Sequence, residues 1–323
     1  MMVPINLPDQ TLATMNEMLV SNYRNERRGY LGASGIGTAC ERRIWNQFHW
    51  IGEEVMTAQS IKAIADGQHS EEVMIDRLRL VPGLSLWTEG VNGKQFNFKD
   101  GHIRGNLDGK IKGVHKNPTD MHVWEHKCIN DKKFNVLVKL ITDNEATALF
   151  NWDEIYFAQA QTYMHYFGIR WHYLTACSSG SRDEISCITA YDPNAAKHYI
   201  DRARGIIKAD RPPPRISESA SWFQCKMCPF TDNCHGDKMP LTNCRTCAHS
   251  TPLEDGSWKC ELLNTPIDEE VQRSGCGKHL FNPGLVPGAQ TDAGEDWVEY
   301  EMKNGTTIRN QNATVTTLSK TSG

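Results

Sequence analysis

Two short stretches decide the fold expected of this chain: Gly105-Asn106-Leu107-Asp108-Gly109 and Trp124-Glu125-His126-Lys127. In an extended strand, side chains two positions apart point to the same face, so Glu125 and Lys127 are predicted to project together. Carboxylates from two neighbouring strands can hold a hard divalent cation through oxygen ligands. A lysine beside them can orient water or stabilise a developing negative charge. The combination is typical of phosphodiester hydrolysis, although each stretch alone also occurs by chance.

The composition sets wide bounds on fold and location. The 323 residues, 39% of them hydrophobic, are enough for one large domain or two modest ones. The chain has no apolar run long enough for a membrane span, and its N-terminus lacks the charged and apolar segments of a signal peptide. We therefore expect a cytoplasmic protein with no membrane partner.

The charge distribution favours a local contact with nucleic acid. The net charge is −4, from 35 basic and 39 acidic residues, so the whole molecule is not a polycation. Residues 101–140 differ, because they hold eight Lys and Arg residues against four acids. This surplus lies around the candidate site, where a phosphate backbone would be bound. A solvated charged surface is the alternative interpretation.

The hydrophobic periodicity predicts an α/β fold, with a mixed sheet flanked by helices. Residues 8–28 are predicted to form an amphipathic helix that packs against the core. The glycine-rich segment 29–43 lacks the Gly-Lys-Ser/Thr ending of a phosphate-binding loop, so no nucleotide-driven motor is expected. Further helices are predicted at 59–80, 152–167 and 193–209, and strands at 91–99, 103–111, 121–129, 171–177 and 184–191.

His69 is a candidate metal ligand within the predicted helix 59–80. A lone histidine on a helix is more often a structural residue than a ligand. The candidate carboxylate site further along the chain makes metal ligation by His69 more favoured than for a lone histidine, because a neutral imidazole is a plausible additional ligand for Mn²⁺.

Eleven cysteines in a chain without an export signal favour metal binding over disulfides. Two partitions are open. In the first, Cys40, Cys225, Cys228 and Cys234 hold an iron–sulfur cluster, and Cys244, Cys247, Cys260 and Cys276 hold zinc, with His235 or His279 as a substitute ligand. In the second, Cys225, Cys228, Cys244 and Cys247 form a zinc ribbon, which leaves the other four without an arrangement. The first is preferred, and Cys128, Cys177 and Cys187 are expected to be small core residues.

The order of these motifs resembles the PD-(D/E)xK nuclease superfamily. The matching residues are Ser34-x5-Cys40, Gly67-x-His69, Gly105-x2-Asp108, Glu125-x-Lys127, Gln159-x3-Tyr163 and Cys225-x2-Cys228-x5-Cys234. More narrowly, the order is similar to the iron–sulfur RecB-like branch, which includes the AddB nuclease domain and CRISPR-associated RecB-like exonucleases. The resemblance covers residues 30–236, and Leu107 stands where the superfamily name has proline. No helicase motif accompanies it, as in stand-alone members, some of them virus-encoded.

This resemblance implies a restriction-endonuclease-like core and a role for each motif. His69, Asp108, Glu125 and the backbone carbonyl of His126 are implied as ligands of Mg²⁺ or Mn²⁺, and Lys127 as the water-orienting or charge-stabilising base. Gln159, Tyr163, Arg42 and Arg43 are expected to contact DNA or support the site. Cys40, Cys225, Cys228 and Cys234 would hold a [4Fe-4S] cluster that clamps distant parts of the chain together.

Four segments are expected along the chain: an N-terminal helix (1–29), the nuclease core (30–238), a zinc-binding module (239–282) and a tail (283–323). The tail carries a predicted hairpin over 298–308, because its Asn304-Gly305 pair suits a tight turn. Its five acids against three bases fit a protein contact or a flexible end better than a DNA-binding arm.

The expected function is a DNA exonuclease acting on single strands or ends, with 5′→3′ polarity favoured by the resemblance. A structure-specific endonuclease is the second hypothesis, since the same chemistry serves both. A third, of another class, is a DNA-binding or assembly protein that uses the nuclease fold as a scaffold and docks a protein partner through its cysteine-rich segments.

Overall fold

A five-stranded mixed sheet is the central element of the computed structural model, which describes residues 9–24 and 27–318. Its strands, in spatial order, are β2 (Ser85–Trp87), β5 (Gly109–Val114), β6 (Asn117–Ile129), β7 (Trp171–Ser178) and β8 (Glu184–Ala190). Only β6 and β7 pair in parallel, and the other neighbours are antiparallel. The predicted α/β class, with a mixed sheet flanked by helices, is confirmed.

Two helices connect the parallel strands β6 and β7, as a parallel pair requires a crossover. They are α4 (Asp131–Trp152) and α5 (Glu154–Phe167). Gly168 ends α5 in the left-handed conformation at φ 63°, where glycine is favoured, so the predicted helix 152–167 ends as expected. The sequence analysis assigned no helix to α4. Asn144, at φ −163° and ψ 99°, interrupts its helical geometry, so the apolar residues do not keep one continuous helical spacing.

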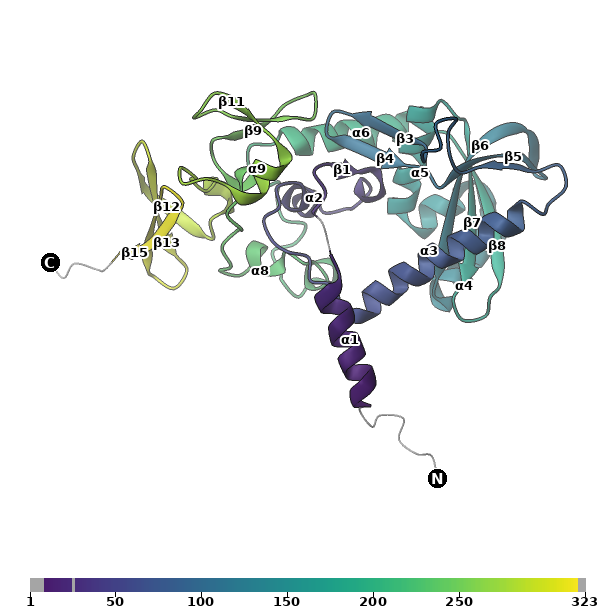
Figure 1. Ribbon diagram of the computed structural model, residues 1–323, viewed down its shortest axis with the longest axis horizontal. Coiled ribbons are helices and arrows are strands. Elements are labelled where there is room, and N and C mark those ends of the chain that lie inside the picture. Colours follow the sequence, from purple (N-terminus) through teal and green to yellow (C-terminus); the bar gives the residue numbers. More distant parts are fainter. Residues whose placement is uncertain (1–8, 25–26, 319–323) are drawn as a thin grey trace.

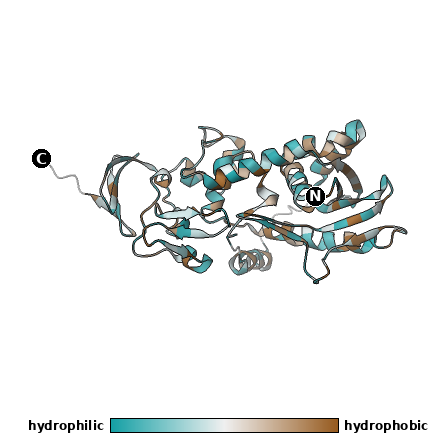
Figure 2. Ribbon diagram, turned by 90° about the horizontal axis from the view of Figure 1, so that it is seen from above, coloured by the Kyte–Doolittle hydropathy of each residue, from teal (hydrophilic) through white to brown (hydrophobic). Residues whose placement is uncertain are grey.

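The two faces of β6 bury different partners, because successive side chains of a strand point to opposite sides. Trp124 packs with residues of α3 (Ala58–Leu78), whose predicted range is confirmed. Val123, on the other face, packs among α4 and α5 residues such as Leu137 and Met164. Hydrophobic and hydrophilic residues accordingly alternate along the sheet and helices in Figure 2.

The predicted strand 103–111 is two strands that belong to different sheets. Its first part is β4 (Ile103–Asn106), which lies between β1 (Leu31–Gly32) and β3 (Asn97–Asp100) in a three-stranded sheet. Its second part is β5 of the five-stranded sheet, so Asp108 stands at the junction between the two sheets. The predicted strand 91–99 is confirmed only for its last residues, in β3.

A further hydrophobic cluster, distinct from those on the two faces of β6, packs residues near the sheet against the C-terminal part of the chain. It brings α2 (Glu41–Phe48) against α6 (Pro193–Lys208), whose predicted range is confirmed, together with Ile36, which follows the 3-10 turn η1 (Ala33–Gly35). Trp258 and Ile267 of the cysteine-rich segment are buried in the same cluster. The cysteine-rich segment is therefore packed onto the core.

The second part of the cysteine-rich region, residues 223–276, is the cysteine-rich segment, residues 244–276. The whole region is built from short elements. They are α7 (Phe223–Lys226), α8 (Thr231–Cys234), η2 (Cys244–Thr246), α9 (Glu269–Ser274) and a three-stranded sheet of β9 (Ser250–Pro252), β10 (Trp258–Cys260) and β11 (Thr265–Ile267).

After η3 (Pro283–Leu285), the chain ends in an antiparallel sheet of β12 (Gly288–Ala293), β13 (Trp297–Met302), β14 (Thr307–Gln311) and β15 (Thr314–Leu318). The predicted hairpin is confirmed as β13 and β14, with Gly305 at φ 77° in the turn. This sheet lies at one end of the long axis in Figure 1, and the five-stranded sheet lies at the other.

Arg245 fixes the cysteine-rich segment to the core. Its side chain is 3% exposed, and its guanidinium lies 3.8 Å from the centre of the Trp50 ring and 4.8 Å from that of Trp258. It donates hydrogen bonds to the carbonyls of Phe48 and Gly29, each at 2.9 Å. Aromatic faces and carbonyl oxygens thus accommodate a buried cation that has no carboxylate within ion-pair distance among the described contacts.

The N-terminal helix α1 (Gln10–Asn22) does not pack as predicted. None of its residues is buried, and Leu12, Met15 and Met18 are exposed. The helix projects from the rest of the molecule beside the start of α3 (Figure 1). No helix within residues 9–24 and 27–318 is long and apolar enough to cross a membrane.

Gly105 permits a close approach that any side chain would block. A methyl group at this position would lie 2.5 Å from Tyr163 Cε1 and 2.6 Å from Phe98 Cε1. We expect Gly105→Ala to lower the free energy of unfolding by about 1–3 kcal/mol, as overpacking does. Gly67→Ala, in α3 with open space around it, is the matched control and should be neutral or stabilising. Urea unfolding of both variants checks this, and equal effects would contradict it.

Candidate active site

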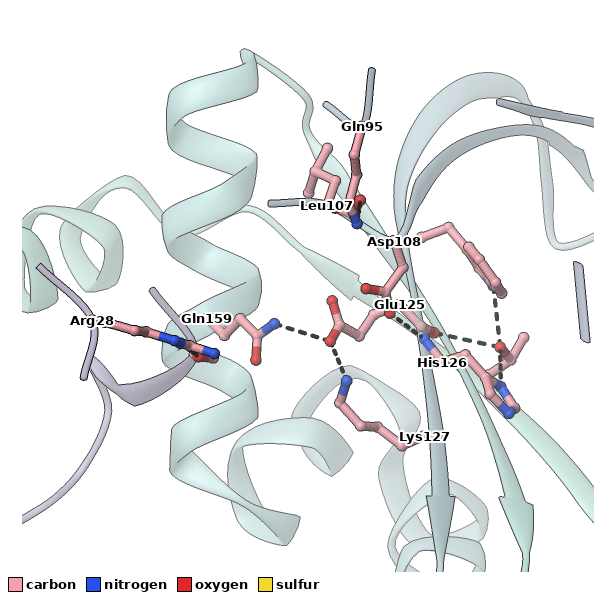
Figure 3. Close-up of polar contacts among 11 residues, drawn as sticks. Arg28, Gln95, Leu107, Asp108, Glu125, His126, Lys127 and Gln159 are labelled. Carbon is pink, nitrogen blue, oxygen red and sulfur yellow. Dashed lines mark hydrogen bonds and ion pairs between the residues drawn. The ribbon is translucent and has the colours of Figure 1, made fainter. Parts of the chain in front are cut away.

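Asp108 and Glu125 are brought together by the pairing of β5 with β6. Gly109 lies opposite Trp124 in this ladder, so the residues beside them, Asp108 and Glu125, approach each other. The backbone N–H of His126 donates to Asp108 Oδ2 at 3.1 Å, which orients this carboxylate (Figure 3). Burial raises the pKa of Asp108 above its ordinary value.

Glu125 is a buried carboxylate with one oxygen bound and one free. It is 4% exposed, and its Oε1 accepts hydrogen bonds from Gln159 at 2.9 Å and from Lys127. Its Oε2 has no hydrogen-bond partner among the described residues. Burial, and next the nearby charge of Asp108, raise the pKa of Glu125 to about 7. A buried oxygen without a partner, beside a second carboxylate, fits a divalent cation as the missing partner.

Lys127 supplies the positive charge of the group. Its ammonium forms an ion pair with Glu125 and lies 5.5 Å from the centre of the Tyr156 ring. Burial alone would lower the pKa of Lys127, but the charges of Glu125 and Asp108 raise it above its ordinary value. The lysine therefore remains an ammonium at neutral pH, which suits charge stabilisation rather than proton removal.

Glu71 is a third carboxylate at this site that the sequence analysis missed. It projects from α3, and burial followed by the charge of Asp108 raises its pKa to about 7. A signal was present in the sequence, because Glu71 begins the stripe continued by Met74, Ile75 and Leu78, which pack against the sheet. A carboxylate at such a position points toward the core.

His69 is not brought to the carboxylates. It lies two residues before Glu71, and two residues of an α-helix turn the side chain by about 200°, to the opposite face. The His69 side chain is 79% exposed, and its Nδ1 lies 3.9 Å from the Glu72 carboxylate. The part of α3 that faces the site therefore presents Glu71 rather than the predicted histidine.

The ring of His126 faces away from Glu125 and Lys127. Its Nδ1 lies 3.0 Å from Thr175 Oγ1 and its Nε2 lies 2.9 Å from Ser70 Oγ, so it is held between β7 and α3. Burial, and next the charge of Lys127, lower the pKa of His126 to about 4. The ring is neutral and structural, which leaves the backbone of His126 as its part nearest the carboxylates.

Gln159 and Tyr163 both lie beside Glu125, as their four-residue spacing on α5 predicts. Gln159 donates to Glu125, and Tyr163 is buried next to it. Burial, followed by the charges of Glu125 and Asp108, raises the pKa of Tyr163 above its ordinary value. Arg28, from the N-terminal segment, approaches Gln159 from the other side (Figure 3).

Arg42 and Arg43 lie away from the carboxylates. Both line a cavity of about 250 Å³ that the first predicted set of cysteines also lines. Arg42 Nε donates to the carbonyl of Pro213 at 2.6 Å. Their expected contact with DNA stays a prediction, and the structure places them beside the sulfur atoms.

The cysteines gather into two groups that match the first predicted partition and not the ribbon. The cavity near Arg42 is lined by Cys40, Cys225, Cys228 and Cys234. Burial, followed by the charges of Cys234 and Cys40, raises the pKa of the Cys225 thiol. Three thiols from one short segment and one from far upstream therefore share a single space, and none of the described cysteines forms a disulfide.

The second group is Cys244, Cys247, Cys260 and Cys276, which line another small cavity. Burial, and then the charges of the other three, raise the pKa of Cys244 to about 11. His279 and His249 line the same space, whereas His235 lines the cavity of the first group and is misplaced in the prediction. The sequence analysis did not consider His249.

Within the residues that the structure describes, no group of three or more His, Cys, Asp or Glu side chains is arranged so that it could hold a metal ion. Of the cysteines expected in the core, Cys187 is buried, while Cys128 and Cys177 are half-buried. Cys177 Sγ lies 3.0 Å from Ser70 Oγ.

Comparisons with known proteins give weak similarities of fold. No family model and no curated protein matches the chain. LHK-Exo, an alkaline exonuclease from Laribacter hongkongensis, is 14% identical with a TM-score of 0.40, over 59% of this chain and 90% of that chain. A phage-related exonuclease from Haemophilus somnus is 13% identical with a TM-score of 0.32, over 59% and 94%. Such low values do not by themselves assign a family.

The raised pKa of Glu125 makes the stability of the metal-free protein depend on pH. Between the unfolded value of 4.5 and the folded value of about 7, the folded protein holds a proton that the unfolded chain has lost. The free energy of unfolding should therefore fall as the pH rises through this window. Urea unfolding at several pH values, compared with Glu125→Gln, checks the effect. The wild type should lose stability relative to the variant as the pH rises, and parallel curves would contradict the burial of this carboxyl.

Proposed function

We propose that this protein is a metal-dependent deoxyribonuclease that hydrolyses phosphodiesters as an exonuclease on single-stranded DNA or DNA ends. The observation that supports it most is the buried, unpartnered Oε2 of Glu125 between Asp108 and Lys127. Among the residues that the structure describes, three carboxyl groups share this site with a single ammonium, so a divalent cation would supply the missing positive charge.

Asp108 and Glu125 would hold Mg²⁺ or Mn²⁺, with the backbone carbonyl of His126 and with Glu71 as further oxygen donors. A bound cation of this kind lowers the pKa of water and neutralises charge on a phosphate. The residues of the chain orient these groups: Gln159 holds one oxygen of Glu125, and the N–H of His126 holds Asp108. The Lys127 ammonium would stabilise the negative charge that develops during hydrolysis.

As an alternative to binding the cation, Glu71 would accept the proton that the attacking water loses, because it lies beside Asp108 at the same site. His69 remains a predicted ligand, and its exposed position on α3 makes Glu71 the better supported of the two.

Glu125→Ala and Asp108→Ala are expected to lower cleavage of linear single-stranded DNA by at least about 100-fold, because the charge that organises the site is lost. The measurement uses end-labelled linear and circular strands with Mn²⁺, and circular dichroism to verify folding. Loss of one end label before the other gives the polarity, for which 5′→3′ is expected.

His69→Ala is the matched control on α3 and should retain more activity than Glu71→Ala. Unchanged cleavage by Glu125→Ala would remove this site from the mechanism, and cleavage of circles would indicate an endonuclease.

We also propose that Cys40, Cys225, Cys228 and Cys234 hold a [4Fe-4S] cluster and that Cys244, Cys247, Cys260 and Cys276 hold Zn²⁺. Thiolates are the ligands that both groups prefer, and in each set the sulfur atoms line one cavity. A cluster at the first set would join the start of α2 to residues almost two hundred positions later, a long loop whose closure is stabilising in principle.

Elemental analysis of anaerobically purified protein tests the two cysteine sets. Cys225→Ser should lower the iron content and leave the zinc, because it lies only in the first set. Cys247→Ser should lower the zinc and leave the iron. Cys128→Ser, outside both sets, is the control and should change neither metal. Zinc in both sets, or no metal at all, would contradict the assignment.

A further inference from the structure

A groove of about 850 Å³ runs beside the N-terminal segment and belongs to none of the sites described above. Among the residues that the structure describes, four arginines line it, against two carboxylates, Glu53 and Glu54. The arginines are Arg24, Arg27, Arg28 and Arg273. The local balance is therefore positive in a protein whose overall charge is negative.

Hydrogen bonds hold the backbone of residues 27–29, which carries two of these arginines, Arg27 and Arg28. The carbonyl of Arg27 accepts a hydrogen bond from Arg273, that of Arg28 from Trp50 Nε1, and that of Gly29 from Arg245, each at 2.9 Å. Trp50 and Arg245 are themselves buried. Three successive carbonyls are thus bound by groups from elsewhere in the chain, which fixes the backbone from which Arg27 and Arg28 project toward the groove.

The cysteine-rich segment supplies two of these three donors. Arg245 lies within η2, between Cys244 and Cys247, and Arg273 lies on α9, shortly before Cys276. The guanidinium of Arg273 also lies 4.8 Å from the centre of the Trp50 ring, on the groove. This segment therefore both positions the arginine wall and contributes a residue to it.

Arg28 connects the groove to the candidate active site. It lines the groove, and its guanidinium lies 3.4 Å from Ser34 Oγ and points toward Gln159 (Figure 3). Gln159 in turn donates to Glu125. A strand lying along the arginines would therefore reach the carboxylates at the Arg28 end.

We propose that this groove binds the sugar-phosphate backbone of single-stranded DNA, and that the cysteine-rich segment 244–276 serves to position it. The inference rests on the proposed function, because it takes the bound strand to be the substrate of the carboxylate site. Arginines bind phosphate oxygens through several donors at once, which suits a backbone contact independent of base sequence.

The other lining residues favour a single strand over a duplex. Apolar side chains line the same groove and are open to solvent, among them Val55, which is 83% exposed, and Ile64, which is 41% exposed. Tyr23 adds an aromatic ring. A single strand presents unstacked bases to such surfaces and phosphates to the arginines, whereas a duplex keeps its bases stacked inside.

Binding is tested by fluorescence anisotropy with a labelled oligothymidylate about 20 nucleotides long, longer than the usual binding sites of single-strand proteins. The protein is the full chain carrying Glu125→Gln, without added divalent cation, so that the strand stays intact. In this background, Arg24→Gln with Arg27→Gln should weaken binding about tenfold and lower the slope of log affinity against log salt by about 1.4, or about 0.7 per lost phosphate contact. Arg273→Gln should lower the slope by about 0.7.

The matched control is Arg79→Gln with Arg182→Gln, which removes two positive charges at exposed positions that do not line the groove. Affinity and salt slope should match the parent protein. Equal effects of the two double variants would overturn the proposal, as would a duplex of the same sequence that competes better than the single strand. Because binding is read without cleavage, a failure of the groove is distinct from a failure of the carboxylate site, which the Glu125→Ala cleavage assay reports separately.

Discussion

The crowding of three carboxyl groups, one of them buried, around one ammonium among the described residues is the constraint on which the centre of this molecule depends. Asp108, Glu125 and Glu71 influence one another's ionisation, and Lys127 offsets only part of their charge. Burying unbalanced charge is costly, so each carboxyl must gain a partner or a proton. Gln159 and the N–H of His126 satisfy some of the oxygens. The oxygen that remains without a partner among the described residues, Glu125 Oε2, is the one that a divalent cation would bind.

The periodicity of the sequence was enough to predict the main strands and helices that carry the candidate active site. It failed where the position of a residue depends on how two of these elements pack together. The alternation around Glu125 correctly placed that residue and Lys127 on one face of a strand. The apparent strand 103–111 crosses from one sheet to another at Asp108, and no periodicity within it reveals the change. The choice between His69 and Glu71 likewise depends on which face of α3 meets the sheet. Glu71 could have been found from its place in the apolar stripe, whereas His69 was chosen by analogy of motif.

The cysteine spacings predicted which thiols come together, because short spacings leave little freedom to a chain. They did not separate the two histidines considered for the zinc set, because His279 lines the cavity of that set whereas His235 lines the other cavity. The burial of Arg245 between aromatic rings could not be predicted from the sequence either. An arginine in a cysteine-rich segment is ordinarily a surface residue, and only the converging rings of Trp50 and Trp258 make its burial possible.

The hydrogen bonds from Arg245 and Arg273 to the carbonyls of residues 27–29 join positions more than two hundred residues apart. During synthesis, the arginine segment leaves the ribosome long before the residues that hold it. A nascent chain can form its five-stranded sheet from residues 85–190 while segment 27–29 still lacks these two anchors. The carboxylates of the candidate active site and the wall of the groove beside them therefore mature at different times. A species truncated before α9 would keep these carboxylates but would lack Arg273 and its hydrogen bond to the Arg27 carbonyl.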